Sequence, residues 1–202
     1  MTTTLRSSFP LAAGEGRPAT DVHLGVIDYL NVVPVYDWLL RREREVGGLP
    51  GIETVAGVPA EMNRALLGGE LDISNVSSFA FGEHARDWLL VPELSVAAHG
   101  RVESVLLFSW HEDWQALDGA AVALSGHSAT SVELLRESKR RGLADLDRLA
   151  SEAAARLRLP RDVCARYLRL LDYELTERDL RGLRRFLELA VSGFDWEAVK
   201  SI

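Results

Sequence analysis

The residues of this sequence best suited to chemistry are an asparagine in a short motif and hydroxyl groups that follow apolar runs. Asn31 lies in Gly25-Val26-Ile27-Asp28-Tyr29-Leu30-Asn31-Val32-Val33-Pro34-Val35-Tyr36, which predicts a strand, a turn and a proline-started helix. An amide can hydrogen-bond a reacting oxygen, but it cannot act as a general base. Taken alone, Asn31 also fits a cap or a turn residue, because asparagine favours both positions.

Two groups of hydroxyl residues lie where an expected strand leads into an expected helix. Ser74, Ser77 and Ser78 follow one apolar run, and residues 126–131 (GHSATS) follow another. Exposed N–H groups at the start of a helix, together with hydroxyls, can bind an anion. The alternative is that each hydroxyl only caps its own helix.

Charge and the known signatures exclude several classes of protein. The formal net charge of −7 repels nucleic acid, so an anionic ligand needs local donors. The basic groups Lys139-Arg140-Arg141 and Arg184-Arg185 stand among acidic residues, which predicts solvated helix faces. The P-loop, His-Glu-x-x-His and Gly-x-Ser-x-Gly signatures are absent, and the five histidines lack metal-ligand spacing. We therefore expect no metal, no cofactor and no nucleic-acid partner.

The chain's location is also constrained. No run of eighteen apolar residues is present, which predicts no membrane span, and residues 1–20 read as a flexible leader without a signal-peptide block. Cys164 is the single cysteine and cannot form an intramolecular disulfide. We expect a cytoplasmic protein.

The order of the apolar patterns predicts an α/β fold. Short β-rich runs at 22–27, 52–56, 71–74, 89–97, 102–109 and 121–125 alternate with helical patterns that begin at Pro34, at Pro59 and near Val132. After Arg136 the pattern is helical to Lys200, and no strand pattern returns.

The motif around Asn31 resembles the N-terminal signature of the chorismate dehydratases of menaquinone biosynthesis, Gly-x-Ile-x-Tyr/Phe-Leu-Asn-x-x-Pro-Leu/Val-Tyr. The resemblance continues in order along nearly all of the chain after Asp21. It is carried by Gly57-Val58-Pro59, Leu66-x-x-Gly69-Glu70-Leu71-Asp72-Ile73, Val76-Ser77-Ser78, Pro92-Glu93-Leu94-Ser95-Val96, Gly100-x-Val102-x-Ser104-Val105, Leu117-Asp118-Gly119-x-x-Val122-Ala123-Leu124, Ser128-x-Thr130-Ser131-Val132 and a run of closing helices.

The resemblance implies a two-lobed fold of the periplasmic-binding-protein type II, with mixed sheets, a helical C-terminus and an incomplete second lobe. Residues 21–99 and 137–202 would form lobe one with the C-terminal helices, and residues 100–136 would be a fragment of lobe two. The family carries roughly a further half-lobe between Arg136 and Arg141. Either the gene encodes an internal deletion or the chain omits a stretch.

The family's activity is the dehydration of chorismate to 3-[(1-carboxyvinyl)oxy]benzoate on the futalosine route, and the resemblance makes Asn31 the catalytic candidate. It also implies a carboxylate-binding set, namely Ser77, Ser78, Ser104, Ser128, Thr130 and Ser131. The start of the helix after Ser128 is expected to face the same cleft as Asn31, Ser77 and Ser78. The alternatives are a catalytically inactive solute-binding remnant of the same fold and a later cyclase of the route, whose N-terminal signature is unlike Tyr29-Leu30-Asn31.

Overall fold

The computed structural model describes residues 22–98, 120–124 and 129–201. The predicted leader, the expected strand at 102–109, Ser104 and Ser128 lie outside these residues. The strands are β1 (Val22–Ile27), β2 (Ile52–Gly57), β3 (Ile73–Ser77), β4 (Leu89–Ala98), β5 (Ala120–Leu124), β6 (Leu171–Asp172) and β7 (Lys200–Ser201). The helices are α1 (Val33–Val46), α2 (Pro59–Leu67), α3 (Ser78–Glu83), α4 (Ala129–Ala144), α5 (Leu146–Leu157), α6 (Arg161–Leu170) and α7 (Glu177–Ala190), and a 3-10 turn spans Trp196–Ala198.

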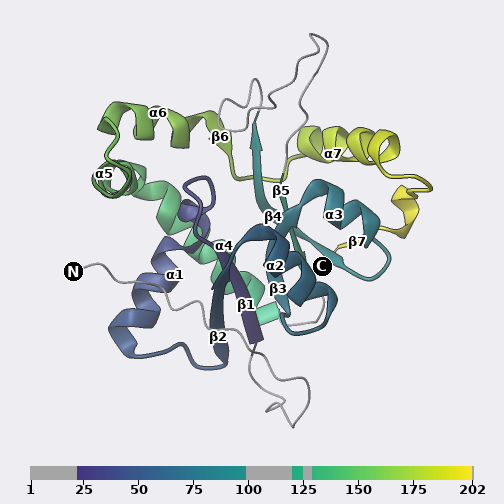
Figure 1. Ribbon diagram of the computed structural model, residues 1–202, viewed down its shortest axis with the longest axis horizontal. Helices are drawn as coiled ribbons and strands as arrows, with labels where there is room; N and C mark the ends of the chain where they lie inside the picture. Colours follow the sequence, from purple (N-terminus) through teal and green to yellow (C-terminus); the bar gives the residue numbers. More distant parts are fainter. Residues whose placement is uncertain (1–21, 99–119, 125–128, 202) are drawn as a thin grey trace.

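One mixed sheet organises the described residues, in the order β2-β1-β3-β5-β4-β6, with β7 beside β4 (Figure 1). β1 is parallel to β2 and β3, whereas β5 runs antiparallel to both β3 and β4. The predicted α/β class with mixed sheets and a helical C-terminal part is therefore confirmed. The prediction that no strand follows Arg136 is wrong, because β6 and β7 pair with β4. Each has only two residues, too few to leave a periodic pattern in the sequence.

α1 and α2 cover opposite faces of the sheet. β2 and β3 flank β1 on opposite sides, and right-handed crossovers then place the two connecting helices on different faces. α2 packs close to β1 at Gly25, where an added Cβ would lie 3.0 Å from Met62 Sδ and 2.6 Å from Ser74 Oγ. The small residue at this position is therefore required for the helix to approach the strand.

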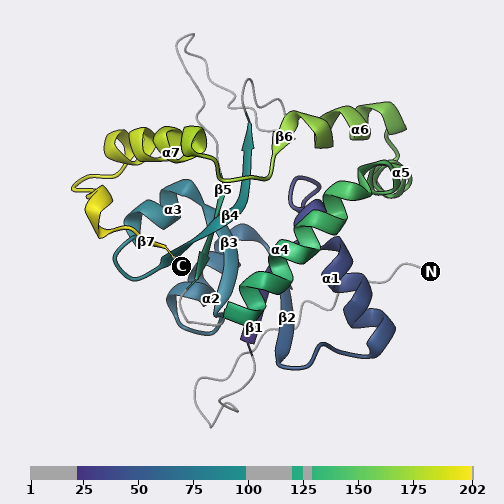
Figure 2. The ribbon, with the colours of Figure 1, turned by 180° about the vertical axis from the view of Figure 1, so that it is seen from behind.

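α4 lies along α1 on the other face (Figure 2). The Leu39 N–H donates to Ser138 Oγ at 3.2 Å, and an added Cβ at Gly142 would lie 1.9 Å from Pro34 O. The solvated-face prediction is wrong for Lys139, which is buried. Its Nζ donates to Glu93 O at 2.6 Å and pairs with Glu174 at 2.7 Å, so it ties α4 to β4.

The strand predicted for the second lobe is part of this same sheet, and the helix predicted to follow it packs against α1. β5 pairs with β3 and β4, and the predicted boundary between residues 136 and 137 falls inside the continuous helix α4. β5 therefore has hydrogen-bonded strands on both of its sides, so its backbone polar groups are paired within this sheet.

α5 and α6 form a helical hairpin with its own apolar cluster. The buried members are Leu149, Ala150, Ala153, Cys164, Ala165 and Leu168. Leu30 and Val33, which flank Asn31, pack against this cluster. The hairpin therefore supports the loop between β1 and α1.

Two buried tyrosines make stability sensitive to alkali. Burial raises the pKa of Tyr36 and the pKa of Tyr173 above the usual value of about 10. Below a pH of about 10 both tyrosine side chains are neutral in the folded and in the unfolded chain. Above it the unfolded chain releases protons that the folded chain keeps, so the free energy of unfolding falls by about 1.4 kcal/mol per pH unit for each tyrosine.

We expect urea unfolding between pH 9 and 11 to show this fall. A Tyr36→Phe, Tyr173→Phe double variant should give a shallower slope of stability against pH. The comparison uses the slope of the free energy of unfolding against pH and not its value at one pH, because either substitution can also shift stability at neutral pH. Equal slopes in the two proteins would contradict the assignment.

Candidate functional site at the carboxyl edge of the sheet

The candidate site lies where the chain leaves β1 and β3. These strands are adjacent and parallel, with Leu24 opposite Ile73 and Gly25 opposite Ser74. From β1 the chain continues to β2, which lies on one side of β1. From β2 it crosses to β3, which lies on the other side of β1, so the topological switch point falls between β1 and β3. In open α/β sheets a crevice forms at the carboxyl edge of such a switch point.

Asn31 lies in a turn at this edge. The Val32 N–H donates to Tyr29 O at 3.1 Å, and Val32, not Asn31, is the N-cap residue of α1. The turn interpretation of Asn31 is therefore confirmed, and the cap interpretation is wrong. The Asn31 side chain is partly exposed, and the neighbouring Tyr29 is half exposed.

Ser77 and Ser78 lie at the end of the adjacent strand. Ser77 is the exposed N-cap of α3, and its Oγ accepts a hydrogen bond from the Ala80 N–H at 3.1 Å. Ser78 is buried in the first helical turn. The two residues are thus not both buried, and Ser77 reaches the same edge as Asn31.

A buried pair that the sequence interpretation did not select joins these two motifs. Tyr36 Oη, in the first turns of α1, donates to Asn75 Oδ1 of β3 at 3.0 Å, and both side chains are buried. The available signal was the pair of polar residues Ser74-Asn75 inside a short strand. Because the hydrogen bond joins α1 to β3, it sets the distance between the turn that holds Asn31 and the end of β3.

The second group of hydroxyls lies at the opposite edge. β5 is antiparallel to β3, so its last residue, Leu124, pairs with Ile73 at the amino end of β3. α4 then begins at this end, and Ser131 lies eleven residues before Gly142, roughly 16 Å along the helix from the contact with Pro34. Thr130 and Ser131 form the first turn of α4, but this turn lies at the opposite edge of the sheet from Asn31 and not at the edge where a shared cleft was expected.

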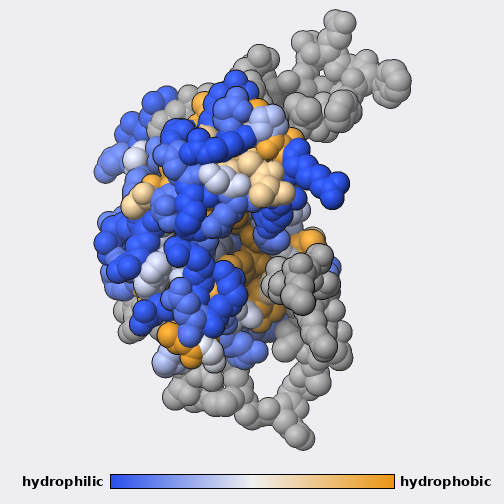
Figure 3. All heavy atoms as spheres, turned by 90° about the vertical axis from the view of Figure 1, so that its left-hand side faces the viewer, coloured by the Kyte–Doolittle hydropathy of each residue, from blue (hydrophilic) through white to orange (hydrophobic). Residues whose placement is uncertain are grey.

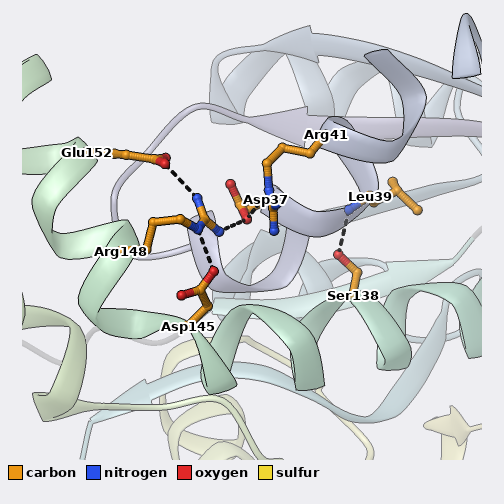
Figure 4. A network of polar contacts seen from close by, with 7 residues as sticks. All are labelled: Asp37, Leu39, Arg41, Ser138, Asp145, Arg148 and Glu152. Atoms are coloured by element: carbon orange, nitrogen blue, oxygen red, sulfur yellow. Dashed lines mark hydrogen bonds and ion pairs between the residues drawn. The ribbon is translucent and has the colours of Figure 1, made fainter. Parts of the chain in front are cut away.

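Arg148 links the hairpin to α1 through a polar network (Figure 4). Its guanidinium lies 2.6 Å from Asp37 and 2.8 Å from Glu152, and Asp37 also binds Arg41 at 3.0 Å. Burial lowers the pKa of Arg148, but hydrogen bonds to Asp37, Asp145 and Glu152 together raise it above its usual range. The network therefore holds α5, and with it the support of the Asn31 turn, against α1.

We expect Arg148→Met to lower the free energy of unfolding by about 2 kcal/mol, because it leaves the largely buried Asp37 with Arg41 as its remaining partner. The matched control is Arg184→Met, which breaks the exposed pair with Glu188 and should cost less than about 1 kcal/mol. Urea unfolding of both variants measures the difference. Equal losses of unfolding free energy in the two variants would show that the network does not stabilise the contact between α5 and α1.

The surface of the described residues has two hollows, and neither is lined by Asn31, Ser77 or Ser78. One hollow lies between the end of α3 and residues 191–198, and a shallow one runs along α6. On the face that carries α5 and α6, most of the coloured surface is hydrophilic, with a smaller hydrophobic area beside it (Figure 3). Within the described ranges no group of three His, Cys, Asp or Glu residues could hold a metal ion. No helix of the described residues is long and apolar enough to cross a membrane.

Solved structures with little sequence identity share this fold. The Candida albicans CA3427 gene product, described as having the generic periplasmic binding protein fold, is 10% identical with a TM-score of 0.59, over 88% of this chain and 92% of that one. Protein AF1704 from Archaeoglobus fulgidus is 12% identical with a TM-score of 0.58, over 85% and 98%. The alkanesulfonate-binding protein SsuA of Xanthomonas axonopodis is 11% identical with a TM-score of 0.55, over 93% and 100%. The chain therefore has a periplasmic-binding-protein-like fold.

Sequence comparison identifies the family. A chorismate dehydratase of Thermus thermophilus is 44% identical over 114 residues, which cover 56% of this chain and 38% of that relative. The chain thus spans well under half of the relative's length. The profile of the family described as Menaquinone biosynthesis matches residues 22–136 and 132–192. Because these two segments together include most of the sequence, the chain belongs to the menaquinone biosynthesis family.

Proposed function

We propose that this chain is a chorismate dehydratase, a lyase that converts chorismate to 3-[(1-carboxyvinyl)oxy]benzoate in the first committed step of the futalosine route to menaquinone. The observation that supports this most is the meeting of two family motifs at one edge, Tyr29-Leu30-Asn31 after β1 and Ser77-Ser78 at the end of β3. The name of the Thermus relative gives the reaction. We place the reaction in the cytoplasm, because the lone Cys164 cannot form an intramolecular disulfide.

The proposed reaction removes the C4 hydroxyl and the C3 proton of chorismate as one water molecule, and aromatisation of the ring drives it. The Asn31 amide would donate a hydrogen bond to the departing oxygen. The C3 proton would pass to the substrate's own enolpyruvyl carboxylate, because an amide cannot accept it. The exposed hydroxyl of Ser77 would donate a hydrogen bond to a carboxylate of the substrate.

The remaining hydroxyl candidates lie either at the opposite edge of the sheet or outside the described residues. Thr130 and Ser131 lie far from Asn31, so we do not place them at this site. Ser104 and Ser128 stay predictions of carboxylate binding, because they lie outside the described residues.

The test is a product assay with purified protein and chorismate, followed by chromatography and mass spectrometry. We expect the benzoate product to accumulate in proportion to enzyme concentration. Binding of chorismate without product would instead identify a solute-binding remnant of the same fold.

A further inference from the structure

We propose that Arg156 of α5 is a substrate-binding residue that holds one carboxylate of the ligand at the carboxyl edge of the sheet. The proposal rests on the proposed function, since it names a further residue of that same site. Arg156 Nη1 lies 2.6 Å from Asp28 Oδ1, although the two residues are 128 positions apart in the sequence. Asp28 directly follows β1 and precedes Tyr29-Leu30-Asn31.

The helix that carries this guanidinium is fixed close to the turn that holds Asn31. Leu30 and Val33, on either side of Asn31, pack against the apolar cluster of the α5–α6 hairpin. Arg148 fixes the same hairpin to α1. A side chain anchored on α5 beside Asp28 therefore stays close to the turn without depending on a long flexible loop.

Arg156 also remains accessible to a ligand. The side chains of Arg156 and Asp28 are 47% and 52% exposed, and the single bond to Asp28 uses one of the five donors of the guanidinium. The hairpin's other ion-paired arginines bind elsewhere: Arg148 binds three carboxylates, and Arg161 and Arg169 both bind Asp147.

The chemistry of the ligand explains why a cation is needed here. The proposed ligand carries two carboxylates, whereas the chain has a formal net charge of −7. Serine hydroxyls supply no positive charge to offset the repulsion. The planar fork of an arginine matches a carboxylate through two parallel hydrogen bonds. Tyr29, which follows Asp28 in the sequence, has a half-exposed ring on which the ligand's ring can pack.

The simpler role for this pair is an exposed ion pair that only steadies the turn. The two roles predict opposite effects of Asp28→Asn. If Arg156 binds a carboxylate, removing the charge of Asp28 removes a repulsion and frees the guanidinium, so the ligand should bind more tightly. If the pair only steadies the turn, the same change loosens the turn, and the ligand should bind more weakly.

The experiment is calorimetric titration of the intact chain with 3-[(1-carboxyvinyl)oxy]benzoate, which measures binding without turnover. Arg156→Gln should raise the dissociation constant about tenfold, as expected for a lost charge-assisted hydrogen bond. Asp28→Asn should lower it about threefold. Arg161→Gln is the matched control, an exposed and paired arginine of the same hairpin, and should leave the constant unchanged.

Chorismate turnover, measured on the same preparations, separates this inference from the proposed reaction. If the unmutated chain binds the benzoate but forms no product, the proposed reaction is wrong, and the Arg156 assignment is judged by the binding data alone. Equal binding by the unmutated chain and Arg156→Gln, or weaker binding by Asp28→Asn, overturns the assignment whatever the turnover. Failure of the unmutated chain to bind the benzoate overturns the Arg156 assignment, and product formation from chorismate then decides the proposed reaction by itself.

Discussion

Replacement of Asn31 by alanine is expected to lower chorismate turnover about 100-fold, because one lost hydrogen bond to a developing oxyanion costs roughly 3 kcal/mol. The melting temperature should barely move. Asn31 is partly exposed in a turn, and the N-cap of α1 is Val32, so alanine removes no helix cap. A large loss of turnover with a small loss of stability is typical of a group that acts on the reacting atoms.

Asn31→Asp is the discriminating variant. Aspartate has the same shape and favours turns as readily as asparagine, so a purely structural role predicts that it preserves both activity and melting temperature. A hydrogen-bond donor role predicts that it is as damaging as alanine, because an ionised carboxylate cannot donate and repels an anionic substrate. Turnover and thermal melts of the three proteins, measured side by side, decide between the roles. Full activity of Asn31→Asp would exclude the donor role.

Replacement of Gly142 by alanine is expected to destabilise the fold by about 3 kcal/mol or more, at the upper end of overpacking effects. The added Cβ would lie 1.9 Å from Pro34 O and 2.7 Å from the Pro34 carbonyl carbon. Both are backbone atoms, so no side-chain rotation can relieve the overlap, and α4 must separate from α1. Since Pro34 is in the first turn of α1, the shift would also move the turn that holds Asn31.

Gly182→Ala is the matched control for this prediction. Gly182 is in α7, and an added Cβ there meets no atom within 4 Å. Alanine should therefore stabilise the protein by about 0.5–1 kcal/mol through its higher helix propensity. Urea unfolding of the two glycine variants should move in opposite directions. If Gly142→Ala proves too unstable to purify while Gly182→Ala purifies normally, that result agrees with the prediction, and an unchanged midpoint for Gly142→Ala contradicts it.

The sequence by itself determined the features that depend on short stretches of chain. The alternation of apolar runs and prolines at helix starts specified β1, α1, β2, α2 and the α/β class, because period and turn chemistry are local properties. The ordered motifs also pointed to the family that the comparisons show. The sequence placed the third strand at residues 71–74, whereas β3 extends to Ser77, and it left Asn31 open as a cap or a turn residue.

Only the tertiary structure decided which of these pieces meet. The sequence predicts a strand at residues 121–125, but the antiparallel place of β5 between β3 and β4 depends on pairing with distant partners. This direction sends the start of α4 away from Asn31. The contacts that define the candidate site join residues far apart, such as Tyr36 with Asn75 and Asp28 with Arg156. Such contacts leave no period or motif in the sequence, because each forms only when helices and strands pack against one another.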